Sequence, residues 1–540
     1  MGAHLPFGPR AKRLEAGHGT MAAESGAAEG PAEPAVREGF LELPPPFVIG
    51  SGTAAYQVEG GAFQGGRWSS IWDEFCREPS RVFEGHTGDV ACDHYHRFKD
   101  DVALMAHLGL HAYRFSISWS RLIPEGVGDV NEEGAGFYSD LIDALLEKGI
   151  TPWVTLYHWD LPSSLEYDFG GWHGPKERMV AAFGAFARTC FQRFGNRVKH
   201  WLTLNEPWCV AVMGHLLGTH PPRLLEAKTT QPYEVAHNLL LSHAEAVRIY
   251  RAEFAEQGGQ IGMALCLHWF QPLDPSSEED VRSAQRARDF ALGWFADPVY
   301  FGDYPASMRE TCGSRLPSFT EAEKALLQGS TDFFGINCYS TYFARAGNPF
   351  PEMPEGWFYD MNVLVPLLKD PAWENTGNSW PIVPWGLREM LLYIQDRYKP
   401  AGGIVVTENG CAHEPDASFE LDKEPDALIP KEHNPETCPP EDLEGETFED
   451  PHRVRFLRAH LAAVHAARER GADVRGYFAW STFDNFEWFD GYKQRFGIVR
   501  VDFRTQRRVI KASGRWLGDV ARRGGLEAPP KAEQYPGHCF

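Results

Sequence analysis

Two segments far apart in the chain have the same form, Thr203-Leu204-Asn205-Glu206-Pro207 and Val405-Val406-Thr407-Glu408-Asn409-Gly410. In each, an apolar, β-branched run of strand character ends in a glutamate with an asparagine beside it. A single glutamate at the end of a strand is most often an exposed loop charge. Two of them, on different strands and each beside an asparagine, indicate instead that the strands deliver both carboxylates to one site.

Strands of this kind recur along the chain and alternate with longer stretches of helical periodicity, which is typical of βα units. Eight strands are predicted, at Phe47–Gly52, Ala112–Ser116, Thr151–Leu156, His200–Leu204, Gln260–Leu267, Phe333–Asn337, Gly403–Thr407 and Val474–Trp480. Helices are predicted between them, among them Tyr95–Leu108, Tyr138–Lys148, Lys176–Phe194, Tyr233–Phe254, Ala284–Phe295, Trp385–Tyr398 and Pro451–Arg470. A doubly wound open sheet shares this alternation, but no GxGxxG motif follows any of the strands. We therefore predict an α/β fold, a single (β/α)8 TIM barrel with long βα loops.

Many of the chemically useful side chains come directly after these strands. They include Gln57, Arg114, His158, Asn337, Tyr339 and the segment from Trp480 to Glu487. In a (β/α)8 barrel all strands end on one face, and active sites lie there. The fold therefore predicts that these side chains and both glutamates line one pocket.

The composition argues against several classes of function. Lys and Arg number 52 and Asp and Glu 74, for a net charge of −22. This balance disfavours nucleic acid and anionic membrane surfaces, which are bound through clustered Lys and Arg. No run reaches the roughly 18 apolar residues of a membrane helix. The ten cysteines include no CxxC pair, which favours buried thiols over a disulfide framework.

Three regions are predicted from the change of composition along the chain. Residues 1–42 are rich in Ala, Gly, Glu and Pro and are expected to be a disordered leader, 43–516 the (β/α)8 barrel domain, and 517–540 a terminal tail. Residues 411–450 hold six Pro and fourteen acidic side chains against two basic ones, and are expected to be a solvated loop. The leader has no apolar secretory signal, so a cytoplasmic location is predicted, with an organellar transit peptide left open.

Seven motifs in order carry a resemblance to a known family. They are FVIGSGTAAYQVEG at 47–60, YRFSISWSR at 113–121, LYHWDLP at 156–162, TLNEP at 203–207, NCY at 337–339, TENG at 407–410 and WSTFDNFEW at 480–488. Together they resemble glycoside hydrolase family 1, the β-glucosidase family. The resemblance covers the chain from Phe47 to about Gly514.

The resemblance implies a retaining β-glucosidase, which hydrolyses terminal non-reducing β-D-glucosyl residues through a covalent glycosyl-enzyme intermediate. Galactosyl and fucosyl substrates stay open. Glu206 would be the general acid/base and Glu408 the nucleophile, with carboxyl groups about 5–5.5 Å apart. By the same resemblance Arg114, Tyr339 and Asn337 would orient the nucleophile. The sugar would be bound by Gln57, His158, Asn205, Trp480, Glu487 and Trp488, with Asn205 at the 2-hydroxyl and Trp480 as the stacking surface.

Alternatives within and beside the family are weighed on single residues. Glu487 would repel the phosphate of a 6-phosphoglycoside, and a thioglucosidase would dispense with the acid Glu206. A non-catalytic barrel scaffold would lack one of the carboxylates, whereas a transglycosidase uses the same residues and stays open. Asp93-His94-Tyr95-His96 offers no third ligand nearby, so no metal and no cofactor is predicted. The expected partner is a small β-glucoside or oligosaccharide; its aglycone and the oligomeric state stay open.

Overall fold

A computed structural model describes residues 39–223, 229–352, 355–365, 368–413, 448–531 and 535 of the protein. From Leu41 onward the described residues form one compact unit, in which eight parallel strands close into a barrel. The strands are, in order around the barrel, β2 (Val48–Gly52), β3 (Ala112–Ser116), β4 (Thr151–Tyr157), β5 (His200–Asn205), β6 (Gln260–Cys266), β8 (Phe334–Asn337), β10 (Ile404–Asn409) and β11 (Val474–Trp480). Each predicted strand overlaps an observed one, and the predicted TIM barrel is confirmed.

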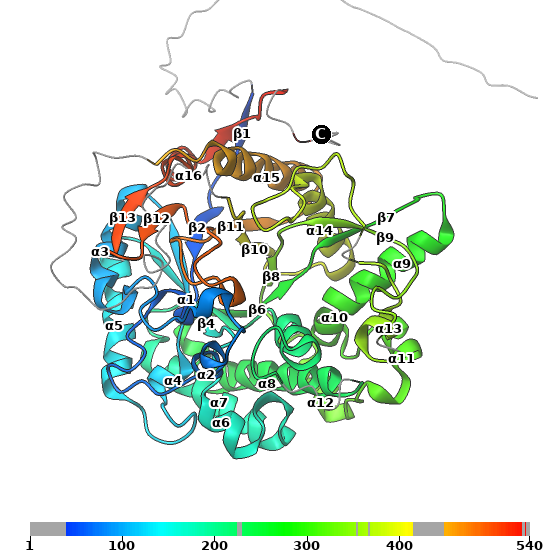
Figure 1. The fold of residues 1–540 in the computed structure, drawn as a ribbon, viewed down its shortest axis with the longest axis horizontal. Helices are drawn as coiled ribbons and strands as arrows, with labels where there is room; N and C mark the ends of the chain where they lie inside the picture. The colour runs from blue at the N-terminus through cyan, green and yellow to red at the C-terminus, as the bar shows by residue number, and fades with distance from the viewer. Residues whose placement is uncertain are drawn as a thin grey trace, which may run out of the picture. The chain divides into compact units, whose positions relative to one another are not determined.

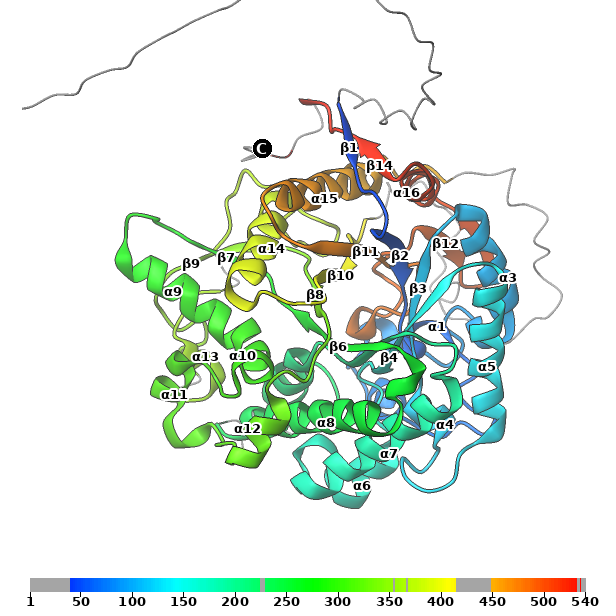
Figure 2. The ribbon, with the colours of Figure 1, turned by 180° about the vertical axis from the view of Figure 1, so that it is seen from behind.

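Helices surround the barrel and cover the outer faces of its strands (Figures 1 and 2). The longer ones are α3 (His94–Leu108), α5 (Glu132–Glu147), α7 (Lys176–Phe194), α8 (Gln231–Glu253), α9 (Glu278–Arg288), α14 (Pro384–Tyr398), α15 (Pro451–Glu469) and α16 (Ala512–Arg523). Shorter ones are α1 (Ala55–Val58), α2 (Ile71–Arg77), α4 (Trp119–Leu122), α6 (Ser163–Phe169), α10 (Trp294–Phe301), α11 (Ala306–Cys312), α12 (Glu321–Leu327) and α13 (Trp357–Met361). Consecutive helices of the ring pack side by side, as α7 does against α8 and α14 against α15.

Two helices begin earlier than their apolar periodicity predicts. Helix α5 starts at Glu132 rather than Tyr138, and its first turn is acidic, which suits the positive end of the helix dipole. Helix α9 starts at Glu278 because Ser277 caps it by accepting a hydrogen bond from the Asp280 amide. The segment predicted as one helix to Phe295 continues through a π-helical turn, η5 (Asp289–Gly293), into α10.

The interior of the barrel is filled by side chains from all around the ring. Each of the eight strands, or the residue just before it, contributes one apolar residue: Val48, Ala112, Trp153, Leu202, Ala264, Phe333, Val405 and Phe478. Small residues therefore lie opposite or beside large ones, which is how such a barrel reaches the density of a solid core. A second, larger apolar layer lies between the strands and the helices.

Three short sheets lie outside the barrel. They pair β1 (Phe40–Glu42) with β14 (Gly525–Glu527), β7 (Trp269–Pro272) with β9 (Thr341–Ala344), and β12 (Val499–Asp502) with β13 (Arg507–Ile510). The first of them pairs residues from the expected leader with residues from the expected tail. The expected leader ran to residue 42, yet 40–42 form a strand, and the Leu43 amide donates to the Gly524 carbonyl at 2.8 Å.

The predicted tail likewise begins inside helix α16. Leu517 on that helix is fully buried and Val520 and Ala521 are nearly so, which means that its apolar face belongs to the core. Residues 1–38 of the expected leader and 414–447 of the expected acidic loop lie outside the described residues. Among the described helices, none combines the length and the apolar character that a bilayer span requires.

Candidate active site

The two glutamates stand at the carboxyl ends of their strands. Glu408 belongs to β10 and Glu206 directly follows β5. The backbone of Glu206 has a positive φ of 44°, which residues other than glycine rarely adopt. Its amide donates to the Ala264 carbonyl on β6 at 2.8 Å. A strained backbone conformation persists only where contacts with the surrounding structure stabilise it, and such conformations are concentrated at functional sites. The chain then enters the π-helix η3 (Cys209–Leu217).

Each carboxylate oxygen of Glu408 has its own donor. Arg114 on β3 forms an ion pair with Oε1 through Nη1, and Tyr339 donates from Oη to Oε2 at 2.7 Å. Burial and the negative charge of Glu408 raise the pKa of Tyr339 well above its usual value, so the phenol keeps its proton and remains a donor. The two donors hold the Glu408 carboxylate, which is only 3% exposed, in one orientation.

Glu206 lies in a different environment. Its pKa is raised to about 7, chiefly because burial disfavours the charged form and secondly because Glu408 is negatively charged. Asn337 donates to Oε1 at 2.8 Å and the Cys209 thiol to Oε2 at 3.1 Å, and both contacts partly offset the rise. Near neutral pH this carboxyl group therefore exists in both protonation states, which is what a general acid that later acts as a base requires.

Asn337 is expected to orient Glu408 or Tyr339 indirectly, and its direct contacts are with other residues. Its side-chain oxygen accepts from the Thr407 hydroxyl at 2.6 Å, so the amide nitrogen must face the other way. That nitrogen donates to Glu206 and to Asn205, at 2.8 and 3.1 Å. Asn337 therefore contacts Glu206 directly, and it reaches Glu408 only through other residues.

The residues expected to bind the sugar come together beside the glutamates. Nε2 of Gln57 donates to Oε2 of Glu487 at 3.2 Å. The His158 ring lies nearly parallel to the rings of Trp480 and Trp488, with ring centres 5.8 and 5.9 Å away. All five side chains are buried except for that of Glu487, which is half-buried. Burial, Asp490 and Glu408 raise the pKa of Glu487 well above its usual value.

The hydrogen bonds of Asn205 decide which nitrogen of His158 carries the proton. The Asn205 oxygen accepts from Arg114 at 2.6 Å and from Asn337, so its amide nitrogen faces Nε2 of His158 at 2.9 Å. Nε2 is therefore the acceptor, and Nδ1 carries the hydrogen. Burial lowers the pKa of His158 well below its usual value, which keeps the ring neutral. Within the described part of the chain, Nδ1 of His158 and Oε1 of Gln57 are buried without a hydrogen-bond partner.

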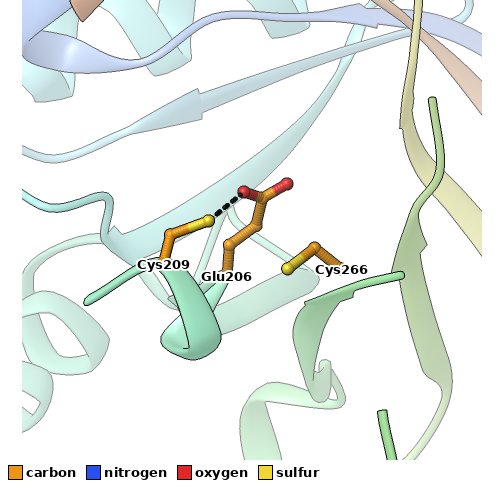
Figure 3. A group of neighbouring side chains, drawn as sticks. All are labelled: Glu206, Cys209 and Cys266. Carbon is orange, nitrogen blue, oxygen red and sulfur yellow. Dashed lines mark hydrogen bonds between the residues drawn. The ribbon is translucent and has the colours of Figure 1, made fainter. Parts of the chain in front are cut away.

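Four contributors to the site were not predicted. Trp159 donates to the Asn205 carbonyl at 3.0 Å, Asn485 accepts from Gln57 at 3.1 Å, and Thr407 and Cys209 hold Asn337 and Glu206 as described. The spacing of Cys209, three residues after Glu206 at the start of a helical segment, is a signal that could have identified it. Figure 3 shows the Cys209 thiol and Glu206 together, with Cys266 beside them.

The histidines considered for a metal have other partners. His94 pairs with Asp101 at 2.7 Å, and His96 contacts Asp93 at 2.5 Å and Gln64 at 2.7 Å. Of these contacts, only the one with Gln64 joins helix α3 to another segment. Nε2 of His94 is buried without a hydrogen-bond partner among the described residues.

Comparisons with known proteins identify the family of the chain. The family profile described as glycosyl hydrolase family 1 matches residues 41–425 and 436–526. Beta-glucosidase 4 of rice (Oryza sativa subsp. japonica) is 44% identical over 501 residues, which cover 91% of this chain and 97% of the relative. The solved structure of a rice beta-glucosidase mutant in a covalent complex with Glc is 41% identical, with a TM-score of 0.80, and the match covers 88% of this chain and 98% of that one.

A bacterial structure is nearly as similar. The family 1 β-glucosidase of Thermotoga maritima is 38% identical, with a TM-score of 0.79, over 90% of this chain and 99% of that one. The barrel, the paired glutamates at its rim and matches along nearly the whole chain lead to one conclusion. The chain belongs to glycosyl hydrolase family 1.

Proposed function

We propose that this protein is a retaining β-glucosidase that removes terminal non-reducing β-D-glucosyl residues through a covalent glycosyl-enzyme intermediate. The observation that carries the proposal is the asymmetry of the two buried carboxyl groups. Glu206 has a pKa raised to about 7 and can hold a proton, whereas both oxygens of Glu408 are engaged by Arg114 and Tyr339. Retaining hydrolysis needs one carboxyl group of each kind.

In the first step Glu408 attacks the anomeric carbon while the proton of Glu206 passes to the departing aglycone oxygen. The bond from the anomeric carbon to the aglycone breaks as the bond to Glu408 forms. In the second step Glu206, now a carboxylate, takes a proton from water, and the water oxygen displaces Glu408 from the sugar. Two inversions give net retention, and Glu206 ends protonated again. The covalent complex of the rice relative with Glc supports this route.

Glucose recognition is proposed for the buried polar groups that have spare hydrogen-bonding capacity. Nδ1 of His158 offers a donor and Oε1 of Gln57 an acceptor, and neither has a partner among the described residues. One amide hydrogen of Asn205 is free for the sugar 2-hydroxyl, and Trp480 offers an indole face beside His158. The Thermotoga relative has been solved with glucoimidazole and with galacto-hydroximolactam, which supports both glucosyl and galactosyl substrates.

A panel of nitrophenyl β-glycosides with cellobiose tests the proposal. Glu408→Gln is expected to lower kcat by at least about 10⁴-fold, because no covalent intermediate can form. Glu206→Gln should retain formation of the intermediate only with a leaving group as acidic as dinitrophenol, which departs without a proton. Near-normal turnover of cellobiose by Glu408→Gln would overturn the mechanism. Product analysis with an added alcohol tests the transglycosidase alternative. If the sugar is mainly transferred to the alcohol, the enzyme is a transglycosidase and not a hydrolase.

A further inference from the structure

Two thiols stand beside the proton-transferring carboxyl group. Cys209 lies at the start of η3, and Cys266 is the last residue of β6, the strand next to the one that Glu206 follows (Figure 3). One ligand atom from each of the three residues lies within 4.8 Å of the other two. The Cys209 thiol already donates to Oε2 of Glu206 at 3.1 Å. Both Cys209 and Glu206 are buried, while Cys266 is partly exposed and gives solvent access to the group.

Neither thiol takes part in the bond-making and bond-breaking steps of the proposed mechanism, although Cys209 donates to Glu206. Both cysteines are free, so they are not consumed by a disulfide. Two sulfur atoms and a carboxylate oxygen form a ligand set that suits thiophilic d¹⁰ cations and not Mg²⁺ or Ca²⁺, which prefer oxygen. At a Zn–S bond length of about 2.3 Å, tetrahedral geometry places two sulfurs roughly 3.8 Å apart. The sulfur atoms of Cys209 and Cys266 lie within 4.8 Å of each other, so they reach that spacing by moving about 1 Å or less closer together.

We propose that Glu206, Cys209 and Cys266 form a binding site for a thiophilic divalent cation such as Zn²⁺ or Cd²⁺, and that occupancy of this site switches the enzyme off. Both thiols bind as thiolates and release their protons to solvent. Glu206, once it shares its carboxylate with the ion, can neither donate a proton to the aglycone nor take one from water. The binding half of the inference is independent of the proposed function, and the inhibition half rests on it.

Charged and polar side chains from three other strands lie around the group. Glu408 from β10 and Arg114 from β3 face Glu206, and Asn337 from β8 donates to it. Burial raises the pKa of Cys209 well above its usual value. The hydrogen bond with Cys209 lowers the pKa of Cys266, but burial and the charges of Glu206 and Glu408 outweigh it, so this pKa is also raised.

The test is a titration of the purified full-length enzyme with Cd²⁺ alone. Thiolate-to-cadmium absorption in the near ultraviolet reports binding, and hydrolysis of a nitrophenyl glucoside reports activity. Both should saturate over the same Cd²⁺ concentrations, and a chelator should reverse both. Cys266→Ala is expected to keep its activity without metal, to bind one Cd²⁺ fewer per chain, and to need at least about 10-fold more Cd²⁺ for half-inhibition.

Cys338→Ala is the matched control, because Cys338 is a buried thiol just after β8 that does not belong to the group. It should respond to Cd²⁺ like the parent enzyme. Cys209→Ala should also bind one Cd²⁺ fewer per chain, but its activity without metal is not used as a readout, because Cys209 donates to Glu206. Equal sensitivity of the parent and Cys266→Ala, or a parent without the absorption change, would overturn the inference. A parent that shows the absorption change but hydrolyses no glycoside without metal would instead refute the proposed function and leave the cation site standing.

Discussion

Asn205 connects the two halves of the active site at the scale of single residues. Its side-chain oxygen accepts from Arg114 at 2.6 Å and from Asn337 at 3.1 Å. Arg114 also pairs with Glu408, and Asn337 also donates to Glu206. The three residues therefore form a continuous hydrogen-bonded bridge from Glu408, the proposed nucleophile, to Glu206, the proposed acid, and a change at Asn337 acts first on Glu206.

Asn337→Ala is expected to shift the alkaline limb of the pH profile of kcat/KM to higher pH. Glu206 must carry its proton to act as an acid, so the rate should fall as the pH rises through the pKa of this group, about 7. The hydrogen bond from Asn337 lowers that pKa, and its loss should raise it. We also expect kcat/KM at the optimum to fall by roughly 10- to 100-fold, the value of a hydrogen bond to a charged group. Measuring kcat/KM of the parent and of Asn337→Ala from pH 5 to 9 tests both expectations.

The control for this prediction is Tyr339→Phe, which removes a donor from Glu408 and none from Glu206. It should lower the rate and leave the alkaline limb in place. If Asn337→Ala moves only the acidic limb, Asn337 acts on the nucleophile after all.

Sequence motifs predict which residues share the pocket, but not how each side chain is turned. Glu206, Glu408, Arg114 and Tyr339 have the expected neighbours, because the strand ends that carry them meet at one rim. The direction of the Asn337 amide depends on a hydroxyl from the next strand, that of Thr407. Such a contact between two strands has no spacing along the chain that would reveal it.

At the scale of elements, the end of β10 packs against the end of β11 without room for a side chain. A Cβ on Gly410 would lie 1.8 Å from the carbonyl oxygen of Trp480, whereas one on Gly52, at the end of β2, would lie 3.4 Å from the Trp480 ring, an ordinary contact. Gly410→Ala must therefore push apart the strand ends that carry Glu408 and the indole surface. We expect it to lower kcat/KM at least about 100-fold and to destabilise the fold by about 1–3 kcal/mol.

Gly52→Ala is the matched variant, since it adds the same methyl group against the same tryptophan. It should keep its activity within a few-fold and its thermal midpoint close to that of the parent. Parental kinetics and a parental midpoint in Gly410→Ala, by calorimetry and with glucoside assays, would show that the two strand ends can separate freely.

The elements themselves could be predicted where one pattern dominates. The eight barrel strands are short apolar runs, and each was found. Apolar periodicity does not predict the start of α5, because Glu132 and Glu133 are not apolar. These two residues become a helix signal only through their favourable interaction with the helix dipole. Part of helix α16 falls in the predicted tail. The sequence shows an apolar stripe on this helix, but only the structure shows that Leu517 on the stripe is buried against the rest of the unit.

At the scale of the whole molecule, buried imidazoles should make the protein sensitive to acid. The pKa is lowered by burial to about 4 in His215, His237 and His243 and to about 3 in His220. Between pH 6.5 and 4 the unfolded chain takes up a proton on each of these residues and the folded chain does not. Stability therefore falls with pH in this window, by up to about 1.4 kcal/mol per pH unit for each imidazole.

Buried carboxyl groups oppose this trend. The pKa of Glu166 is raised to about 7 by burial, as is that of Glu206 by burial and Glu408, so between pH 7 and 4.5 the folded chain holds protons that the unfolded chain has released. Burial also raises the pKa values of Asp160 and Glu487 well above their usual range. The imidazoles outnumber these carboxyl groups, because burial lowers the pKa to about 4 in His200, His268 and His413 as well. The net effect is a loss of stability toward acid pH.

We therefore expect the urea concentration at half-unfolding to fall steeply from pH 6.5 to 5. His215→Gln removes one titrating imidazole from a fully buried site and should reduce the slope of the free energy of unfolding against pH by about 1.4 kcal/mol per unit. The comparison uses the slope, so a loss of stability that is the same at every pH does not affect it. An unchanged slope in His215→Gln, or a parent that gains stability toward pH 5, would mean that these imidazoles do not stay neutral in the folded chain.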